Sequence, residues 1–506
     1  MPFCFFPEAV RICIAFSEYI CTMQQQAWWH KNSVMVPVAL SFYALVFILC
    51  SLLSEGAYGG GDSWMHYLFA KYAFKHPENY MDQWAKPVFT LIASPFAWFG
   101  FGGIKLFNIA CALFTAYLSY RIIKEHVEAD AWLSIVFVCS VPIYFVCVYS
   151  GLTEILFALF LVAGIFLYQG FHERYACLLI SFLPFIRSEG FLMIPVFAFA
   201  TLYYRQWKAT PLLAVGTVLF TIIGYFYAHD WKWVFSTNPY LIAGNVYGKG
   251  SLLNFVGANE NIAGLPMVIL ILSTALIFFR QFRHNFHHRM LHIRFVLIFG
   301  CIATYFIAHS IFWRLGIFGS LGLIRVMAGI GPLIGLTAFY AYDYWRQRTW
   351  ARGKVFQYAA WLLVPVIMVI PRKQFAIPNR MSSFEQIQYN SCRWILDNNL
   401  QHNYLYYFDP FVSHLLGVDP FDANTHDVLI YKDNALRIRK DALVIWDSNF
   451  CPQEGHVPLQ WMDTCKDLTL LHEEREPKKP GDTSPEKFIR IYKANAAVEF
   501  INMPVP

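Results

Sequence analysis

The chain has 506 residues, of which 57% are hydrophobic and only 14% are charged. Soluble domains carry roughly 25% charged residues, so this composition excludes an ordinary water-soluble fold and indicates a protein of the lipid bilayer. The formal charge of +6 does not indicate nucleic acid as a partner, because no basic stripe is interleaved with aromatic residues.

The N-terminal residues are predicted to form a cytoplasmic segment over residues 1–33. Charged residues such as Glu8 and Arg11 interrupt the apolar run, and no small-residue cleavage site follows, so a signal peptide is not indicated. Met23 or Met35 is an alternative start of the protein.

Apolar runs long enough to cross a hydrocarbon core of about 30 Å recur between residues 34 and 370. They predict a mainly α fold, a polytopic membrane helix bundle over residues 34–370 with about eleven spans. The two short runs at 176–186 and 190–204 could instead form one tilted helix. The predicted spans are 34–53, 104–123, 131–149, 153–170, 176–186, 190–204, 211–228, 266–280, 295–312, 324–342 and 355–370.

The orientation follows from the connectors, because cationic loops stay on the cytoplasmic side of a membrane. Their pattern is self-consistent only if the stretch 176–204 crosses twice. The cytoplasmic cations are then Arg121, Lys124, Arg174, Arg205, Lys208, Arg280, Arg283, Arg289, Arg294, Arg346, Arg348, Arg352 and Lys354. The segments predicted to face the extracytoplasmic side are 54–86, 150–153, 229–265, 313–323 and the tail after residue 371.

The tail loses the apolar periodicity and carries mixed charge. Strand-like runs at 442–446 and 488–492, together with a helical pattern at 383–399, predict a small extracytoplasmic α/β domain over residues 371–506.

The composition of this tail leads to one further prediction and leaves one pair of cysteines with two alternatives. The stretch Glu473–Pro485 is rich in Lys, Pro, Gly and Ser and is predicted to be an exposed loop. Cys451 and Cys465 lie in polar sequence, where they form either a disulfide or a pair of free thiols.

The first predicted loop contains the most informative motif, Gly59-Gly-Gly-Asp-Ser-Trp-Met-His66. The glycines let the backbone leave the first span sharply, which places Asp62 just beyond the membrane surface and His66 one helical turn further on. A carboxylate there is well placed to act as a general base. Asp62 is also a candidate N-cap of a helix that starts at Ser63, and the two roles are compatible.

A second acid and an Arg-Glu pair follow in short turns predicted to face the same side. Glu154 ends the turn Ser150-Gly-Leu-Thr-Glu, and an ionisable residue at the end of a span in an apolar bundle is a functional candidate. Arg187 and Glu189 lie in the turn between two short spans. They either pair with one another, or Arg187 binds a phosphate through its planar guanidinium.

Further candidate substrate ligands are cationic or imidazole groups. Arg325 follows a glycine-rich entrance to the tenth predicted span, and it is a phosphate candidate by the same reasoning as Arg187. Arg314 and Lys86 are weaker phosphate candidates. His76 precedes a proline in the first loop, as Lys86 does at the end of that loop.

The layout of these motifs resembles the GT-C glycosyltransferases, a superfamily that includes dolichyl-phosphate-mannose mannosyltransferases, aminoarabinose transferases and oligosaccharyltransferases. The resemblance lies in an Asp after the first span, a juxtamembrane helix with aromatic and His residues, and His76-Pro followed by Lys86-Pro. It covers residues 34–340 in layout and is strongest to bacterial polyprenyl-phosphate-dependent, mannosyltransferase-like members.

The resemblance implies roles for individual residues. Asp62 corresponds to the catalytic acid of the first loop, although Ser63 stands where several relatives have a second acid. Glu154 is similar to an acidic position that helps to bind a divalent cation in the oligosaccharyltransferase branch. No cofactor is required by the sequence, but Asp62, Glu154 and His66 would suit Mg²⁺ or Mn²⁺.

The implied reaction is transfer of a sugar, with mannose as one candidate, from a polyprenyl- or dolichyl-phosphate donor to an extracytoplasmic glycan, lipid or protein. Asp62 would deprotonate the acceptor hydroxyl and the cationic groups would stabilise the departing phosphate, which inverts the anomeric centre. Absence of Asn-x-Ser/Thr sites from the predicted outer segments favours a bacterial inner membrane.

Two other classes of protein are compatible with buried charge in a membrane bundle. A transporter of a lipid-linked or anionic substrate would line its pathway with the same residues, but it predicts repeat symmetry, which the sequence does not show. A membrane scaffold would leave the acids of the outer turns unexplained.

Overall fold

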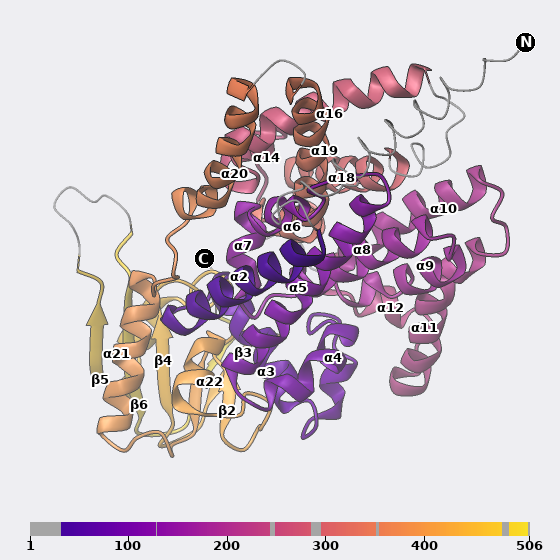
Figure 1. Ribbon diagram of the computed structural model, residues 1–506. Helices are drawn as coiled ribbons and strands as arrows, with labels where there is room; N and C mark the ends of the chain where they lie inside the picture. Colours follow the sequence, from indigo (N-terminus) through magenta and orange to yellow (C-terminus); the bar gives the residue numbers. More distant parts are fainter. Residues whose placement is uncertain are drawn as a thin grey trace, which may run out of the picture.

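The computed structural model describes residues 32–127, 129–242, 248–284, 295–350, 354–477 and 485–503. It consists of a helical body and a smaller strand-containing part at the C-terminal end of the sequence, seen at the lower left of Figure 1. Most of the predicted N-terminal segment and the cations Arg289, Arg294 and Arg352 lie outside the described residues.

The helical body is built from helices of very different length. The α-helices are α2 Asn32–Leu53, α3 Gly61–Tyr72, α4 Pro87–Ala97, α5 Phe101–Lys124, α6 Leu133–Cys139, α7 Pro142–Val148, α8 Glu154–Gln169, α9 Glu173–Ile180, α10 Met193–Tyr203, α11 Val215–Ala228, α12 Trp233–Ser236, α13 Pro239–Ile242, α14 Asn254–Gly257, α15 Asn259–Ile262, α16 Leu265–His284, α18 Gly300–Leu315, α19 Gly331–Trp350 and α20 Lys354–Gln374. Tighter 3₁₀ turns cover Pro77–Tyr80, Leu183–Phe185, Ser188–Leu192, Thr210–Ala214 and Ile324–Ile330, and a π turn covers Phe295–Phe299.

Within the described ranges, five helical segments are long and apolar enough to span a membrane: Asn32–Leu53, Phe101–Lys124, Thr210–Ala228, Phe295–Leu315 and Ile324–Arg348. Shorter apolar helices accompany them at Pro87–Ala97, Glu154–Gln169, Ser188–Tyr203 and Leu265–Arg280. The predicted polytopic helix bundle is therefore confirmed, whereas the count of eleven spans stays a prediction. The apolar helix α4 was not predicted.

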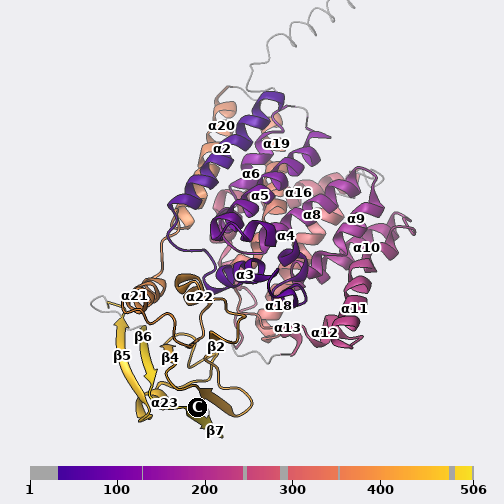
Figure 2. The same cartoon turned by 90° about the horizontal axis from the view of Figure 1, so that it is seen from below.

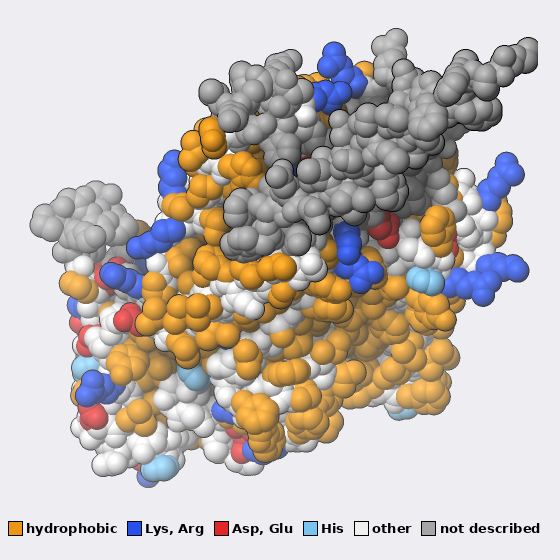
Figure 3. Space-filling view, in the orientation of Figure 1, with side chains coloured by type: hydrophobic (Ala, Val, Ile, Leu, Met, Phe, Trp, Pro, Cys, Tyr) orange, Lys and Arg blue, Asp and Glu red, His pale blue; other side chains and the backbone are white. Residues whose placement is uncertain are grey.

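The surface of the helical body supports the assignment to a membrane. Large apolar side chains are strongly exposed, including Leu52 at 75%, Phe226 at 76% and Leu276 at 70%. Figure 3 shows apolar side chains over a broad face of the helical body, whereas charged side chains are more frequent on the strand-containing part. Lipid tails can cover such a surface, and water cannot do so without a large free-energy cost.

Two predicted spans differ in detail from the structure. The span 131–149 is interrupted before Pro142, which begins α7 because a proline has no N–H group for a continuous helix. The alternative of a single helix over 176–204 is wrong. The chain turns at Arg187, whose backbone is extended with φ −154°, and two separate apolar helices flank this turn.

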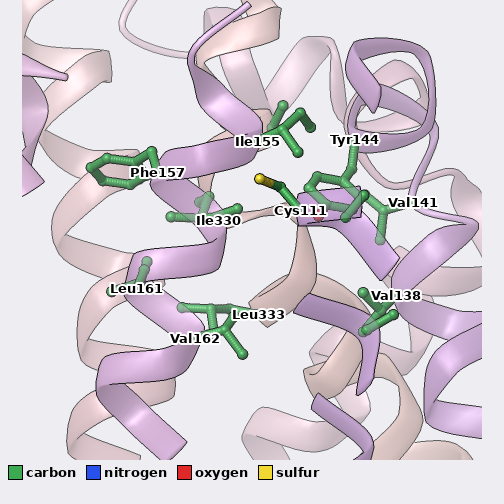
Figure 4. Packing of buried hydrophobic residues seen from close by; sticks show 14 of the residues in the cluster. Cys111, Val138, Val141, Tyr144, Ile155, Phe157, Leu161, Val162, Ile330 and Leu333 are labelled. Atoms are coloured by element: carbon green, nitrogen blue, oxygen red, sulfur yellow. The ribbon is translucent and has the colours of Figure 1, made fainter. Parts of the chain in front are cut away.

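Close packing of short helices forms the centre of the body. Figure 4 shows side chains of α5, α6, α7 and α8 packed against the start of α19. A Cβ atom at Gly335 would lie 2.7 Å from the Cα atom of Val138, and one at Gly331 would lie 2.8 Å from the Cβ atom of Tyr144. Small residues on α19 therefore allow the backbones to approach, as they do between membrane helices generally.

A buried ion cluster lies near the end of α19. Arg346 was assigned to a connector, but it belongs to this helix and is only 4% exposed, while its predicted cytoplasmic side stays a prediction. Its guanidinium pairs with Asp130 and, at 2.8 Å, with Asp343. The cation therefore joins the connector before α6 to α19, because a buried arginine needs carboxylate partners.

The strand-containing part is a small α/β unit, as predicted. Its elements are α21 Ser383–Asp397, β1 Leu405–Tyr407, α22 Pro410–Leu416, β2 His426–Val428, β3 Ala435–Ile438, β4 Leu443–Asp447, α23 Leu459–Thr464, β5 Leu468–Arg475, β6 Phe488–Ala494 and β7 Val498–Ile501. The strand order of the main sheet is β2-β1-β4-β6-β5, with β1 parallel to β2 and β4 and with β6 antiparallel to β4 and β5. A second sheet pairs β3 with β7.

The predictions for this unit are mostly confirmed. The runs at 442–446 and 488–492 form β4 and β6, and the helical pattern at 383–399 forms α21. The loop prediction for Glu473–Pro485 is wrong at its start, because β5 continues to Arg475 and Glu473 pairs across the sheet with Arg490. Cys451 and Cys465 are free thiols.

The α/β unit contacts the helical body through α22 and α3, which lie side by side in Figure 2. The ring of Trp64 stacks on Phe411 at 4.8 Å and on His414 at 4.4 Å between ring centres. The helix that carries Asp62 is therefore held between the membrane body and the C-terminal unit.

Candidate active site

The glycine turn before α3 fixes the position of Asp62. The helix begins at Gly61 with Gly60 as its N-cap, and no side chain caps it, so the interpretation of Asp62 as the N-cap is wrong. Asp62 lies in the first helical turn, where the helix dipole favours a negative charge. Gly59 has φ +89°, and a Cβ atom there would lie 2.9 Å from Nη1 of Arg325. Glycine therefore suits the positive φ of this turn and leaves room for the guanidinium of Arg325.

Arg325 connects the glycine turn with the interior of the bundle. Its Nη2 atom forms an ion pair with Asp62, and its Nη1 atom donates a 3.0 Å hydrogen bond to the carbonyl oxygen of Gly59. Its Nε atom lies 3.9 Å from Oε1 of Glu154. One guanidinium therefore lies between the two acids that the sequence predicted to be catalytic.

Arg187 continues this pattern. Its Nη1 atom lies 2.9 Å from Oε1 of Glu154, and its Nη2 atom lies 2.7 Å from Oε1 of Glu189. The Glu154 side chain is fully buried, and Arg187 also donates a 3.0 Å hydrogen bond to Thr153. The alternative that Arg187 pairs with Glu189 is confirmed, and Glu154 is an additional partner.

The five residues Asp62, Arg325, Glu154, Arg187 and Glu189 form an alternating series of acids and arginines, which we call the ion chain. Its members come from α3, α8, the turn before α10 and the 3₁₀ turn before α19. The side chain of Asp62 is 37% exposed, whereas those of Glu154 and Glu189 are 0% and 18% exposed. Asp62 is therefore the acid of the chain that a substrate reaches most easily.

Lys86 adds a cation beside the ion chain. Its Nζ atom donates 3.2 Å hydrogen bonds to Oγ of Ser188 and to the carbonyl oxygen of Gln83, and it lies 4.4 Å from the centre of the Tyr240 ring. Burial lowers the pKa of Lys86 to about 8, although the negative charge of Glu189 raises it. Lys86 is thus a cation at neutral pH that releases its proton more easily than an exposed lysine.

His66 is close to these cations but is packed as a core residue. Its ring stacks on Trp84 at 5.5 Å and meets the edge of Phe89. Burial lowers the pKa of His66 to about 3, and the charges of Lys86 and Arg187 act in the same direction. The imidazole is therefore neutral at physiological pH, and among the described contacts none joins it to Asp62.

Two predicted site residues lie away from the ion chain. Arg314 is exposed in the last turn of α18. His76 lies at the contact with the C-terminal unit, where its Nε2 atom is 2.9 Å from Oδ2 of Asp419 and Lys75 is 2.8 Å from the same oxygen. The structure therefore assigns His76 to the junction of the two parts rather than to the ion chain.

This junction leads to a testable expectation. The pKa of Asp419 is lowered because hydrogen bonds from Lys75 and His76 outweigh the opposing effect of burial. Its contribution to stability is therefore present above the ordinary carboxyl pKa and is lost as the pH falls through the lowered value. We expect Asp419→Asn to lower the thermal midpoint of unfolding at pH 7, and we expect this difference from the wild type to shrink as the pH falls below the ordinary carboxyl pKa.

Donor binding by the Asp419→Asn variant should equal that of the wild type, because Asp419 does not contact the ion chain in the described structure. The matched control is Asp427→Asn on an exposed position of β2. Equal unfolding midpoints for the two variants at pH 7 would contradict a stabilising role for the junction.

Sequence reasoning missed His309, whose Nε2 atom lies 4.0 Å from Oε1 of Glu189. The sequence did contain a signal for this residue, because an ionisable side chain near the end of the predicted span 295–312 is a functional candidate. Asp409 of the C-terminal unit was missed as well. A Cβ atom at Gly61 would lie 3.9 Å from Oδ1 of Asp409, and no sequence signal links these two positions.

The surroundings of Asp62 and Glu154 bear on the predicted divalent cation. In the part of the chain that the structure describes, no group of three or more His, Cys, Asp or Glu residues is placed to hold a metal ion. Arg325 contacts both acids and already supplies positive charge between them. A divalent cation shared by Asp62 and Glu154 would therefore have to displace this guanidinium, and the dependence on a metal ion stays a prediction.

Comparison with solved structures identifies the fold. The crystal structure of ArnT from Cupriavidus metallidurans bound to undecaprenyl phosphate is similar over 90% of this chain and 97% of that chain, with a TM-score of 0.56 and 10% sequence identity. Its apo state gives a TM-score of 0.55 at 11% identity, over 91% of this chain and 98% of that chain. The apo oligosaccharyltransferase of Archaeoglobus fulgidus gives a TM-score of 0.51 at 10% identity, over 79% of this chain and 66% of that chain.

The chain therefore has the fold of ArnT and of this oligosaccharyltransferase, which agrees with the resemblance of its first-loop motifs to GT-C glycosyltransferases. No family model and no curated protein sequence matches it. The similarity to ArnT extends over nearly the whole of both chains.

Proposed function

We propose that this protein is a glycosyltransferase that takes a sugar from a polyprenyl-phosphate donor and transfers it to an extracytoplasmic acceptor. The observation that carries the proposal is the ion chain, which ends on the accessible carboxylate of Asp62 next to the C-terminal unit. The GT-C fold supports it, since the similar ArnT structure holds undecaprenyl phosphate.

The proposed chemistry is a single displacement. A carboxylate oxygen of Asp62 takes the proton of the acceptor hydroxyl as that oxygen attacks the anomeric carbon. The bond between the anomeric carbon and the phosphate oxygen breaks, and its electron pair leaves with the lipid phosphate. Attack opposite to the leaving group inverts the anomeric centre.

The cations have separate parts in this step. Arg325 holds the side chain of Asp62 and lies at the glycine turn, so its charge is near both the base and an arriving phosphate. Lys86 lies deeper, beside Ser188. Fixed positive charges in a water-poor site stabilise a developing phosphate anion without reorganisation of solvent.

The proposal has three finer parts. The sugar is mannose, the protein lies in a bacterial inner membrane, and its site faces the extracytoplasmic side. Mannose follows from the resemblance of the first-loop motifs to mannosyltransferase-like members. The side of the membrane follows from the cationic connectors that oppose Asp62 and the C-terminal unit.

The test of the function is release of lipid phosphate. Purified protein in phospholipid nanodiscs is incubated with radiolabelled undecaprenyl-phosphate mannose and a membrane extract as the source of acceptor. We expect labelled sugar to leave the lipid and free undecaprenyl phosphate to accumulate. A transporter would move the labelled donor and leave it chemically intact, and that outcome would overturn the proposal.

The same assay tests the dependence on a metal ion. Because Arg325 and Arg187 neutralise the acids of the site, we expect turnover to persist after treatment with EDTA. Loss of turnover in EDTA that Mg²⁺ or Mn²⁺ restores would show that a cation joins Asp62 and Glu154 during the reaction.

A further inference from the structure

A cavity of about 400 Å³ lies between the glycine turn and the C-terminal unit. One wall is the stretch from Ala57 to Gly61 in the membrane body. The opposite wall is formed by the linker after α20, by α21 and by the first residues of α22. Its size falls within the range of small-molecule sites, which is roughly 300 to 1,000 Å³.

Buried polar atoms without partners gather on the residues that line this cavity. The Nδ2 atom of Asn379 and the Oε1 atoms of Glu385 and Gln388 make no hydrogen bond with the rest of the described protein. Gln388 is only 1% exposed and Asn379 only 8%. Most buried polar atoms in proteins are hydrogen-bonded, so one donor and two acceptors left over at one cavity indicate a polar ligand.

The two carboxylate oxygens of Glu385 differ in their hydrogen-bond partners. Its Oε2 atom accepts a 2.8 Å hydrogen bond from the backbone N–H of Ser382 and completes the capping box of α21. Its other oxygen, Oε1, is the unpartnered one. One oxygen therefore has a structural role and the second remains available to accept a hydrogen bond.

Aromatic rings complete the lining. Tyr58 of the membrane body and Phe375 of the linker after α20 meet edge to face at 5.7 Å, and Phe450 lies on the side of the C-terminal unit. All three are half-buried. Aromatic faces combined with a few hydrogen-bonding groups suit a ligand that has both apolar C–H surfaces and hydroxyl groups, as a sugar ring does.

The cavity lies next to Asp62, the general base of the proposed reaction. Gly61 and Asp409 both line it, and a Cβ atom at Gly61 would lie 3.9 Å from Oδ1 of Asp409. Asp62 is the next residue along the chain. Asp409 is 4% exposed and accepts a 2.8 Å hydrogen bond from the N–H of Phe411, so its carboxyl is fixed in place.

We propose that this cavity binds a sugar ring of the acceptor, so that the acceptor of the reaction is a carbohydrate held between the glycine turn and the C-terminal unit. The inference rests on the proposed glycosyltransferase function. Asn379 donates to a ring hydroxyl, Glu385 and Gln388 accept from hydroxyls, and a neighbouring hydroxyl projects past Gly61 to Asp62. The C-terminal unit therefore selects the acceptor.

The probes are the disaccharides maltose, mannobiose and chitobiose, with sorbitol as a polyol that has no ring. Their binding is measured by saturation-transfer difference NMR with the full protein in phospholipid nanodiscs, because maltoside detergents carry a disaccharide that would compete. We expect at least one disaccharide to bind and sorbitol not to bind. Binding of sorbitol alone or of no probe would overturn the proposal.

Two variants locate the binding. Gln388→Leu removes an unpartnered acceptor, and the same change at the exposed Gln386 two residues away is its matched control. Glu385→Gln keeps the capping box, which accepts glutamine, but exchanges the free acceptor for a donor. We expect each of the two cavity variants to raise the dissociation constant of the disaccharide roughly tenfold, which is the usual effect of losing a hydrogen bond to a charged or buried group.

The Gln386→Leu control should bind the disaccharide as the wild type does. Equal affinity of the wild type, this control and both cavity variants would overturn the proposal. Asp62→Asn should retain disaccharide binding, which separates this inference from the proposed reaction. Sugar binding without release of lipid phosphate by the wild type would refute the reaction alone. Release of lipid phosphate by a protein that binds no disaccharide would refute the cavity alone.

Discussion

Replacement of Asp62 by Asn should reduce sugar transfer by about 10²- to 10⁴-fold, the usual loss when a general base is removed. Asn keeps the size of the side chain and an oxygen that Arg325 can bind, but it cannot take a proton at neutral pH. The variant should remain folded. The side chain of Asp62 is 37% exposed, so solvent screening limits the stabilisation from its ion pair to about 1 kcal/mol or less.

The measurement is turnover of radiolabelled undecaprenyl-phosphate mannose together with the thermal midpoint of unfolding. Asp230→Asn is the matched control, because Asp230 is an acid that accepts hydrogen bonds within its own loop. Donor binding by Asp62→Asn should equal that of the wild type. Near-normal turnover would show that Asp62 only holds Arg325, and the proposed base would lie elsewhere.

Replacement of Arg187 by Met is expected to have the largest effect on stability. The guanidinium pairs with Glu154 at 2.9 Å and with Glu189 at 2.7 Å, and all three side chains are largely buried. Removal of one partner from such a group leaves uncompensated charge and typically costs about 3 to 5 kcal/mol. We therefore expect a large fall in the unfolding midpoint or loss of folded protein.

Neutralisation of one partner should restore most of the stability. In the double variant Arg187→Met and Glu154→Gln, the remaining charges of Asp62, Arg325, Glu189 and Lys86 balance, so its midpoint should rise towards that of the wild type. Arg314→Met is the matched control, since this exposed arginine should tolerate the change. A folded Arg187→Met variant with a normal midpoint and lost donor binding would instead identify Arg187 as a direct phosphate ligand.

Much of the helical body could be predicted because long apolar runs in a sequence directly indicate membrane helices. The stretch 34–53 corresponds almost residue for residue to α2, and β4 and β6 were visible as continuous apolar runs. β5 was missed at its end because Glu473 is stabilised by Arg490 on the neighbouring strand, and a cross-strand ion pair leaves no apolar pattern.

The candidate site was predicted as a set of residues but not as an arrangement. Asp62, Glu154, Arg187 and Arg325 were each identified from charge in turns between apolar runs. Which acid pairs with which arginine depends on the packing of the helices, since Asp62 and Arg325 are 263 residues apart in sequence. The cavity near Asp409 could not be predicted for the same reason, because it exists only where the C-terminal unit contacts α3.

The sequence separation within the ion chain has a consequence for biosynthesis. Arg187 follows Glu154 after only 33 residues, so that buried acid meets its cation soon after both have left the ribosome. Asp62 meets Arg325 only after a further 263 residues, which takes roughly 13 to 53 s at about 5 to 20 residues per second. Asp62, which is synthesised long before its arginine, is the more exposed acid, so water can hydrate its charge in the meantime. The fully buried Glu154 meets its arginine first.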